Sequence, residues 1–294
     1  MPKVWIEAAL NGPWGRKHQP GIPDSIEAIV AEGTACAAAG AGIIHVHAYD
    51  GGGPQTFDWQ VYARIIEGIR TQIDVPVYPS IPSAGIGVGP LPTEAAERFH
   101  HVEALAARGL LEFAVVDPGS VNFTALATGP ETAPASTYLN PEAHVRYGLE
   151  LAARHGLHPA YAIYEPGFTR AGAALARATR VKTPLYRLMF SETFAYGFPP
   201  QRWALAAHVE LINAEAEGAP WMIAGLGVDL RQLIPATVGL GGHVRVGLED
   251  APFGCRSSNR ALVEEAVQLI VAAGGEPATV AEIRAELAAL ATRF

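Results

Sequence analysis

Lysine is almost absent from this sequence of 294 residues, which contains only Lys3, Lys17 and Lys182. An enzyme that holds its substrate as a Schiff base needs a lysine amine at the reacting centre. The scarcity of lysine therefore narrows this chemistry to very few positions of the chain.

Cysteine is equally scarce, because Cys36 and Cys255 are the only two. Two cysteines in a chain of this size make no disulfide framework, so we expect a reducing compartment and a buried free thiol at Cys36. The first seven residues contain no apolar signal-peptide core, and no run of about 18 apolar residues occurs anywhere. These absences predict a soluble, cytoplasmic protein.

Blocks of one charge sign are missing as well. The net charge of −8 is spread along the chain, whereas nucleic-acid binding requires clustered lysine and arginine. We therefore expect neither nucleic acid nor a membrane surface as partner. The hydrophobic fraction, in contrast, is high at 49%. This value suits a parallel sheet that is covered on both faces, whose strands are apolar runs.

Short apolar runs alternate with longer helical patterns along the whole chain, which is typical of βα units. The expected strands are 4–9, 42–48, 75–80, 113–117, 159–165, 186–190, 221–225 and 243–247. The expected helices are 24–39, 57–72, 93–108, 141–155, 169–179, 200–217, 231–240 and 258–273. This alternation predicts an α/β protein with a single (β/α)8 TIM-barrel domain over residues 1–294. A further C-terminal helix, 279–292, could cap the barrel or serve an oligomer interface.

An open, doubly wound sheet is the main competing architecture. Its phosphate-binding fingerprint, GxGxxG directly after the first strand, is absent. Residues 84–89 form a glycine-rich segment, but Pro90 and Pro92 follow it where a helix should begin. We interpret this segment as a loop of the active site.

Two histidines at the end of the second expected strand are the strongest sign of chemistry. His45 and His47 are two residues apart, so both side chains point to the same face of the strand. They stand at the carboxyl end, where barrel enzymes have their active sites. Imidazole is a common ligand of zinc and other divalent ions. The pair therefore predicts a metal site.

The last expected strand supplies candidates for a third ligand, since a catalytic zinc usually has three protein ligands. Glu249 and Asp250 follow it at the same rim, and Arg245 lies four residues before Glu249, on the same face of an extended strand. One carboxylate could bind the ion while its neighbour, facing the other way, moves a proton. Arg245 could steady that carboxylate or a substrate oxyanion.

Several motifs together resemble the β-keto acid cleavage enzymes, the group typified by 3-keto-5-aminohexanoate cleavage enzyme, and the resemblance runs nearly end to end. The most specific are His45-Val46-His47 and the segment from Arg245 to Asp250. The others are Ala8-Ala9-Leu10-Asn11-Gly12, Ala39-Gly40-Ala41-Gly42, Asp117-Pro118-Gly119-Ser120-Val121-Asn122-Phe123 and Asn259-Arg260-Ala261-Leu262-Val263.

This resemblance implies a TIM barrel in which His45, His47 and Glu249 bind Zn²⁺, with iron or manganese as other possible ions. It implies that Arg245 and Asp250 move protons. The implied reaction converts a β-keto acid and acetyl-CoA into acetoacetate and a new acyl-CoA, with the metal polarising the keto group. No Schiff base is needed. A homo-oligomer, by resemblance a tetramer, is also implied.

The pocket departs from the pattern of the group. An acidic residue expected after the first strand is replaced by Trp14, and a hydroxylated residue on the fourth strand is replaced by Val115. Ser83 and Gly85 match a substrate-binding segment, and Ser80 is a weaker candidate contact. Trp14 could form an apolar wall, bind a quaternary ammonium group or pack on the rim. The substrate is therefore expected to differ from 3-keto-5-aminohexanoate.

Tyr49 stands where related chains often have a charged residue. We count it with Trp14 and Val115 among the changes that suit another substrate. Glu165 and Glu192 could serve a basic substrate or bind only loop amides.

Three alternatives stay open at this level. An amidohydrolase-like hydrolase would place its histidine pair on the first strand and use later histidines. A metal-dependent lyase or aldolase could use the same two-histidine, one-carboxylate set. A non-catalytic, metal-stabilised ligand-binding barrel would need the histidines but not Asp250. The later histidines fall in expected helices or before strands: His100, His101, His144, His155, His158 and His208.

Overall fold

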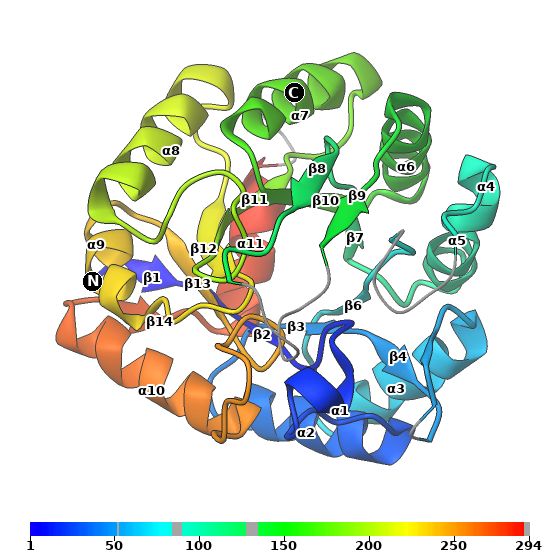
Figure 1. The fold of residues 1–294 in the computed structure, drawn as a ribbon, viewed down its shortest axis with the longest axis horizontal. Coiled ribbons are helices and arrows are strands. Elements are labelled where there is room, and N and C mark those ends of the chain that lie inside the picture. Colours follow the sequence, from blue (N-terminus) through cyan, green and yellow to red (C-terminus); the bar gives the residue numbers. More distant parts are fainter. Residues whose placement is uncertain (52, 84–89, 128–134, 291–294) are drawn as a thin grey trace.

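Eight parallel strands form a nearly closed barrel in the computed structural model, which describes residues 1–51, 53–83, 90–127 and 135–290 (Figure 1). The strands pair in chain order, the last pairs back onto the first, and only β6 and β7 lie side by side without a hydrogen-bonded ladder. The predicted barrel is confirmed. Its strands are β2 (Ile6–Ala9), β3 (Ile43–Val46), β6 (Val77–Pro79), β7 (Phe113–Val115), β10 (His158–Ile163), β11 (Leu185–Phe190), β12 (Trp221–Gly225) and β13 (His243–Val246).

The barrel strands are buried on both faces, as their apolar composition predicts. Every residue of β10 and β11 is buried, because helices cover the outside of the barrel and side chains fill its interior. The long outer helices are α2 (Ile26–Ala38), α3 (Trp59–Arg70), α6 (Glu142–His155), α7 (Pro166–Thr179), α8 (Arg202–Glu215) and α10 (Asn259–Ala272).

Serine caps begin two of these helices. The Oγ atoms of Ser25 and Ser258 accept hydrogen bonds from the N–H groups of Ala28 and Ala261, which satisfies free donors in the first helical turn. Among the residues that the structure describes, no helix is long and apolar enough to cross a membrane. Cys36 and Cys255 are both free thiols.

Two expected helices are interrupted. Helix 93–108 is divided into α4 (Ala95–Arg98) and α5 (His100–Ala106), beside an Arg98 whose buried guanidinium donates to Pro82 O and Asn140 Oδ1. Helix 231–240 is divided into η1 (Arg231–Leu233) and α9 (Ile234–Gly239), because Pro235 is suited to the first turn of a new helix.

Several short elements were not expected. The strand predicted over 4–9 is divided into β1 (Lys3–Val4) and β2, and β1 pairs with β14 (Glu276–Pro277). The others are α1 (Gly15–His18) and two hairpins, β4 (Ala48–Tyr49) with β5 (Gln55–Thr56) and β8 (Val121–Phe123) with β9 (Ser136–Tyr138).

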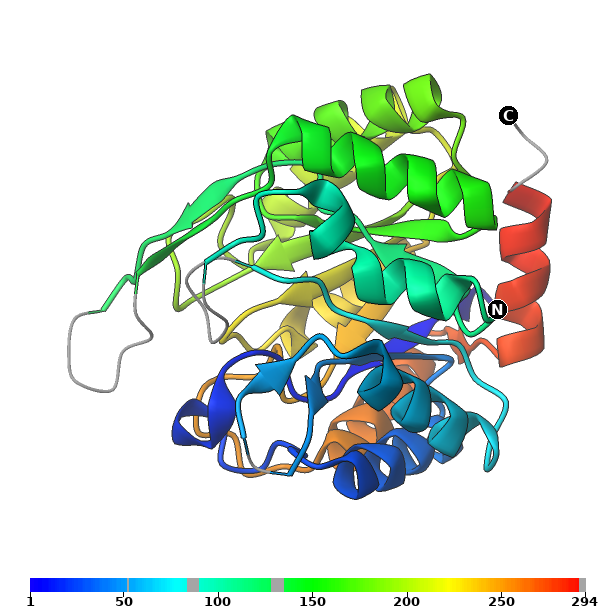
Figure 2. The same ribbon diagram turned by 90° about the vertical axis from the view of Figure 1, so that its right-hand side faces the viewer.

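The two ends of the barrel differ (Figure 2). The C-terminal helix α11 (Val280–Leu290) lies across the amino ends of the strands, where Trp5 Nε1 donates to Glu286 and Thr183 Oγ1 to the carbonyl oxygen of Leu290. Helix α11 therefore caps the barrel, which is one of the two roles predicted for helix 279–292. The β8–β9 hairpin and α1 lie at the opposite end, around the carboxyl ends of the strands. Because α11 covers only the amino ends, the carboxyl ends can form a site.

Candidate metal centre and active site

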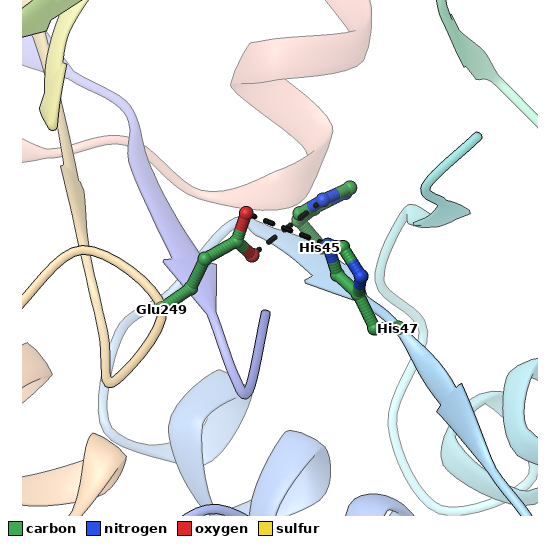
Figure 3. A group of neighbouring side chains, drawn as sticks. All are labelled: His45, His47 and Glu249. Carbon is green, nitrogen blue, oxygen red and sulfur yellow. Dashed lines mark ion pairs between the residues drawn. The ribbon is translucent and has the colours of Figure 1, made fainter. Parts of the chain in front are cut away.

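His45 and His47 point toward the carboxylate of Glu249 at the carboxyl end of the barrel (Figure 3). The Nε2 atoms of His45 and His47 are 3.6 and 3.5 Å from the two carboxylate oxygens, and all three side chains are buried. One ligand atom from each residue lies within 4.8 Å of the others. Among the described residues, no second group of three His, Cys, Asp or Glu side chains approaches as closely.

The loop after β2 holds two of these residues in place. The amide of Asn11 forms a reciprocal pair with the backbone of His47, donating to its carbonyl oxygen and accepting from its N–H group, both at 2.9 Å. Gly12 has a φ of +62°, and a Cβ atom there would stand 2.7 Å from Glu249 Cγ. Glycine thus allows the loop to lie directly against the carboxylate.

The expected extended geometry of Glu249 and Asp250 is wrong. Strand β13 ends at Val246, and Gly247 turns the chain with a φ of +143°, at a point where a Cβ atom would stand 2.0 Å from the carbonyl oxygen of Ala9. The N–H group of Asp250 donates back to Gly247. Because the chain turns here, the two carboxylates do not alternate; both approach Arg245, at 2.9 Å for Glu249 and 2.7 Å for Asp250.

Arg245 is the centre of a buried cluster of charges. Its Nη1 atom is 3.2 Å from Glu7 Oε1, so three carboxylates surround one guanidinium. Burial alone would lower the pKa of Arg245, but Asp250, Glu249 and Glu7 outweigh it and raise the pKa well above its usual range. Burial raises the pKa of Asp250 above that of an ordinary aspartic acid, against the opposing effect of Arg245.

The protonation states of His45 and Glu249 are those that a metal cation requires of its ligands. Burial lowers the pKa of His45 well below its usual range, so its imidazole is neutral, as a ligand must be. Burial would raise the pKa of Glu249, but the guanidinium of Arg245 holds it well below its usual range. The carboxylate is therefore ionised.

A cavity of about 60 Å³ opens at the three candidate ligands, with Arg245 also in its wall. Of the predicted substrate contacts, Ser80, Ser83 and Trp14 line it, and so does Val115. Gly85 lies outside the described residues. Asp250 is not in the lining: its oxygens accept hydrogen bonds from Arg245 and from the N–H group of Gly225.

Trp14 is both a rim residue and a wall of the cavity. Its Nε1 atom donates to the carbonyl oxygen of Glu249 at 2.9 Å, and its ring stacks on Phe194 at 5.8 Å. Tyr49, in contrast, does not line the cavity, because its hydroxyl donates to the carbonyl oxygen of Gly12. Tyr49 therefore contacts the loop beside Glu249 and is not part of the cavity wall.

Neither glutamate suggested for a basic substrate is in the described lining. Glu165 accepts a hydrogen bond from the N–H group of Gly197, and Glu192 is exposed.

The wall opposite the histidines contains residues to which the sequence analysis gave no role in the site. Asp117 from the end of β7 and Arg187 from β11 line it, together with Phe123, Tyr138 and Tyr164. Arg187 could have been noticed, because an arginine inside an apolar strand is costly unless it is paired. The same signal marks Glu7 in β2.

Replacing Glu7 by glutamine should lower both the melting temperature and kcat, without loss of bound metal. Glu7 is fully buried and accepts a hydrogen bond from Arg245, which keeps Glu249 and Asp250 as partners. Weakening a hydrogen bond between charged groups costs about 1.5–3 kcal/mol. Thermal denaturation, steady-state kinetics and elemental analysis measure the three quantities. An unchanged melting temperature and kcat would contradict a positioning role for Glu7. Glu27→Gln, on the surface of α2, is the control.

A model of the β-keto acid cleavage enzyme family matches residues 3–288. The chain belongs to this family. The resemblance inferred from its motifs is thereby confirmed, and the family description indicates an enzyme that acts on β-keto acids.

Two relatives of the β-keto acid cleavage enzyme family match over almost their whole length. The chain is 29% identical over 291 residues to the 3-keto-5-aminohexanoate cleavage enzyme of Fusobacterium nucleatum subsp. nucleatum, with 97% of each chain covered. It is 27% identical over 292 residues to the 3-oxoadipate:acetyl-CoA acetyltransferase of Cupriavidus necator, covering 96% of this chain and 93% of the relative.

The structure of ObcA in complex with oxaloacetate aligns with a TM-score of 0.72 and 16% identity, covering 92% of this chain and 67% of that one. At this identity the likeness shows the barrel fold alone.

Proposed function

We propose that this β-keto acid cleavage enzyme transfers the acyl group of a β-keto acid to coenzyme A, using acetyl-CoA as co-substrate and releasing acetoacetate. The observation that carries the proposal is the buried set of His45, His47 and Glu249 at the end of a cavity that two serines and Arg245 also line. The acetyl-CoA-dependent relative named above supports the co-substrate.

The three side chains fit a divalent cation. Glu249 Oε2 is buried and has no hydrogen-bond partner among the described residues, and both Nε2 atoms face the carboxylate at distances too long for a good hydrogen bond. Such unsatisfied polar atoms are costly without a partner, and a cation between them would supply one. Two imidazoles and one carboxylate are a common zinc set, and we propose Zn²⁺. When bound, it would polarise the keto group.

The residues around this centre have separable roles in the proposal. Ser83, with Ser80 beside it, would donate hydrogen bonds to the substrate carboxylate. Joining an acetyl group to a carbon of the keto acid requires that carbon to lose a proton. Arg245, which lines the cavity, would pass this proton on to Asp250, which lies behind it. The raised pKa of Asp250 favours this exchange. Trp14 and Phe194 would shield the centre from water.

Other features of the proposal follow the family resemblance and stay predictions: a homo-oligomer, most simply a tetramer, and a cytoplasmic location. The amidohydrolase alternative requires further histidines at the metal, and none of the described histidines joins His45 and His47.

The direct test is an assay of the purified, metal-loaded protein with acetyl-CoA and a panel of β-keto acids. We expect acetoacetate and a new acyl-CoA in equal amounts, detected by mass spectrometry and by enzymatic determination of acetoacetate. Products formed without acetyl-CoA would instead support the lyase alternative. Ligand binding without any turnover across the panel would support the non-catalytic barrel.

A further inference from the structure

The metal-binding candidates occupy one side of the cavity, and a different kind of surface faces them. His45 comes from β3 and Glu249 from the turn after β13. The facing wall comes from β7, β10, β11 and the β8–β9 hairpin, which lie across the barrel in the strand order. A keto acid whose keto group lies at these candidates and whose carboxylate lies at Ser83 would direct the rest of its chain toward this wall.

The facing wall is largely apolar and aromatic. Its uncharged members are Val115, Phe123, Tyr138, Ala162, Tyr164 and Met189. Phe123 stacks on Tyr138 at 5.8 Å, and both rings meet Tyr164 edge to face, so the aromatic groups hold one another in place.

The only charged side chains in this described wall neutralise each other. Arg187 Nη2 is 3.5 Å from Asp117 Oδ1, and both side chains are buried. Arg187 also donates to the carbonyl oxygens of Ala160 and Tyr161 and to the Tyr78 hydroxyl, at 3.1, 3.4 and 3.4 Å. Four hydrogen bonds therefore engage four of its five N–H donors, which leaves a single donor on Nη1 for a ligand.

Asp117 is equally committed. Its Oδ1 accepts from the N–H group of Ala162 at 2.6 Å, and its Oδ2 accepts from the Tyr138 hydroxyl at 2.5 Å. Both oxygens act as acceptors, which is the pattern of an ionised carboxylate. The pair thus presents no net charge to the cavity.

We propose that the β-keto acid used by this enzyme carries a short, uncharged side group, which packs against Phe123, Tyr138 and Tyr164. The cavity of about 60 Å³ suits a short group, because one water needs about 10–15 Å³ measured in the same way. This inference rests on the proposed function, and it separates this chain from relatives whose names specify an amino-bearing or a dicarboxylic substrate.

Two matched pairs of β-keto acids test the inference by binding alone. The first pair is 3-oxohexanoate and 3-oxoadipate, in which a carboxylate replaces a methyl group. The second is 5-methyl-3-oxohexanoate and 3-keto-5-aminohexanoate, in which an ammonium group replaces a methyl group. Calorimetric titration of the metal-loaded protein, without acetyl-CoA, should give a Kd at least about 100-fold lower for the uncharged member of each pair.

Equal or tighter binding of either charged member would overturn the inference. Addition of acetyl-CoA then tests the function separately. If the uncharged acids bind preferentially but form no acetoacetate, the substrate class stands and the proposed reaction fails. If a charged acid binds best and is converted, the reaction stands and the inference fails.

Variants of the Asp117–Arg187 pair test directly whether this pair sets the substrate preference. Asp117→Asn leaves Arg187 unpaired and should shift the preference toward 3-oxoadipate by at least about 10-fold. Arg187→Met leaves Asp117 without its cationic partner and should shift the binding preference toward 3-keto-5-aminohexanoate. Arg284→Met removes a partner of Asp74 and Glu112 near the capped end of the barrel, and should leave the preference unchanged. Folded variants in which neither preference moves would show that the pair does not control selectivity.

Discussion

Replacing His47 by alanine should remove the bound metal and abolish turnover. Among the described residues, three groups converge on the centre, and the substitution deletes one of them. The Nε2 atom of His47 is 3.5 Å from Glu249 Oε1. Mutation of groups that merely support a metal ligand costs about 10–100-fold in metal affinity or activity, so loss of a ligand itself should cost more. We expect a loss of more than about 100-fold in metal affinity, measured by elemental analysis after dialysis and by competition with a chelator.

The control is His158→Ala, at the amino end of β10. His158 is exposed to the same extent as His47, 5%, and its Nδ1 atom lies 3.0 Å from the carbonyl oxygen of Thr183, away from the cavity. This variant should be destabilised by the loss of a buried side chain but should keep its metal. Full metal occupancy in His47→Ala would show that His47 is not a ligand.

Replacing Asp250 by asparagine should leave the metal in place but lower kcat by about 10²–10⁴-fold, the usual contribution of a positioned acid or base. Asparagine is nearly the same size and removes the group that would accept the proton. Arg245 keeps its contacts with Glu7 and Glu249, so its charge stays compensated. Steady-state kinetics, elemental analysis and thermal denaturation separate the loss of chemistry from the loss of metal or fold.

Asp229→Asn is the matched control for this experiment. Asp229 follows β12, pairs with Arg231 at the surface and does not line the cavity of the metal-binding candidates. Its substitution should leave kcat and KM unchanged. An Asp250→Asn enzyme with wild-type kcat would exclude a proton-transfer role. A rise in KM with unchanged kcat would assign Asp250 to substrate binding through Arg245 instead.

The barrel could be predicted because its signals are local. Eight apolar runs alternate with helical patterns, and each run folds into a strand between covering helices. The His45–His47 spacing was equally readable, since a period of two determines which strand residues share a face. The errors came where a tertiary contact or a turn overrides the local pattern. The break beside Arg98 and the turn at Gly247 are examples.

The missed residues show a second limit. Glu7 and Arg187 are single charges inside apolar strands, a signal that was used for Arg245 and could have been used for them. Their partners could not be foreseen, because Glu7 and Arg245 are separated by 238 residues and Asp117 and Arg187 by 70. Which charges meet depends on the order of strands around the closed barrel.

The sequence by itself determined the family, the fold and the candidate metal-binding residues, because these depend on motifs and on short-range periodicity. Only the tertiary structure decided which groups face the cavity. It turned Glu249 and Asp250 onto Arg245, directed Tyr49 away, and joined Asp117 to Arg187 opposite the histidines. Pairing between strands neutralises charges that appear free in the sequence, and it therefore sets the charge that the cavity presents.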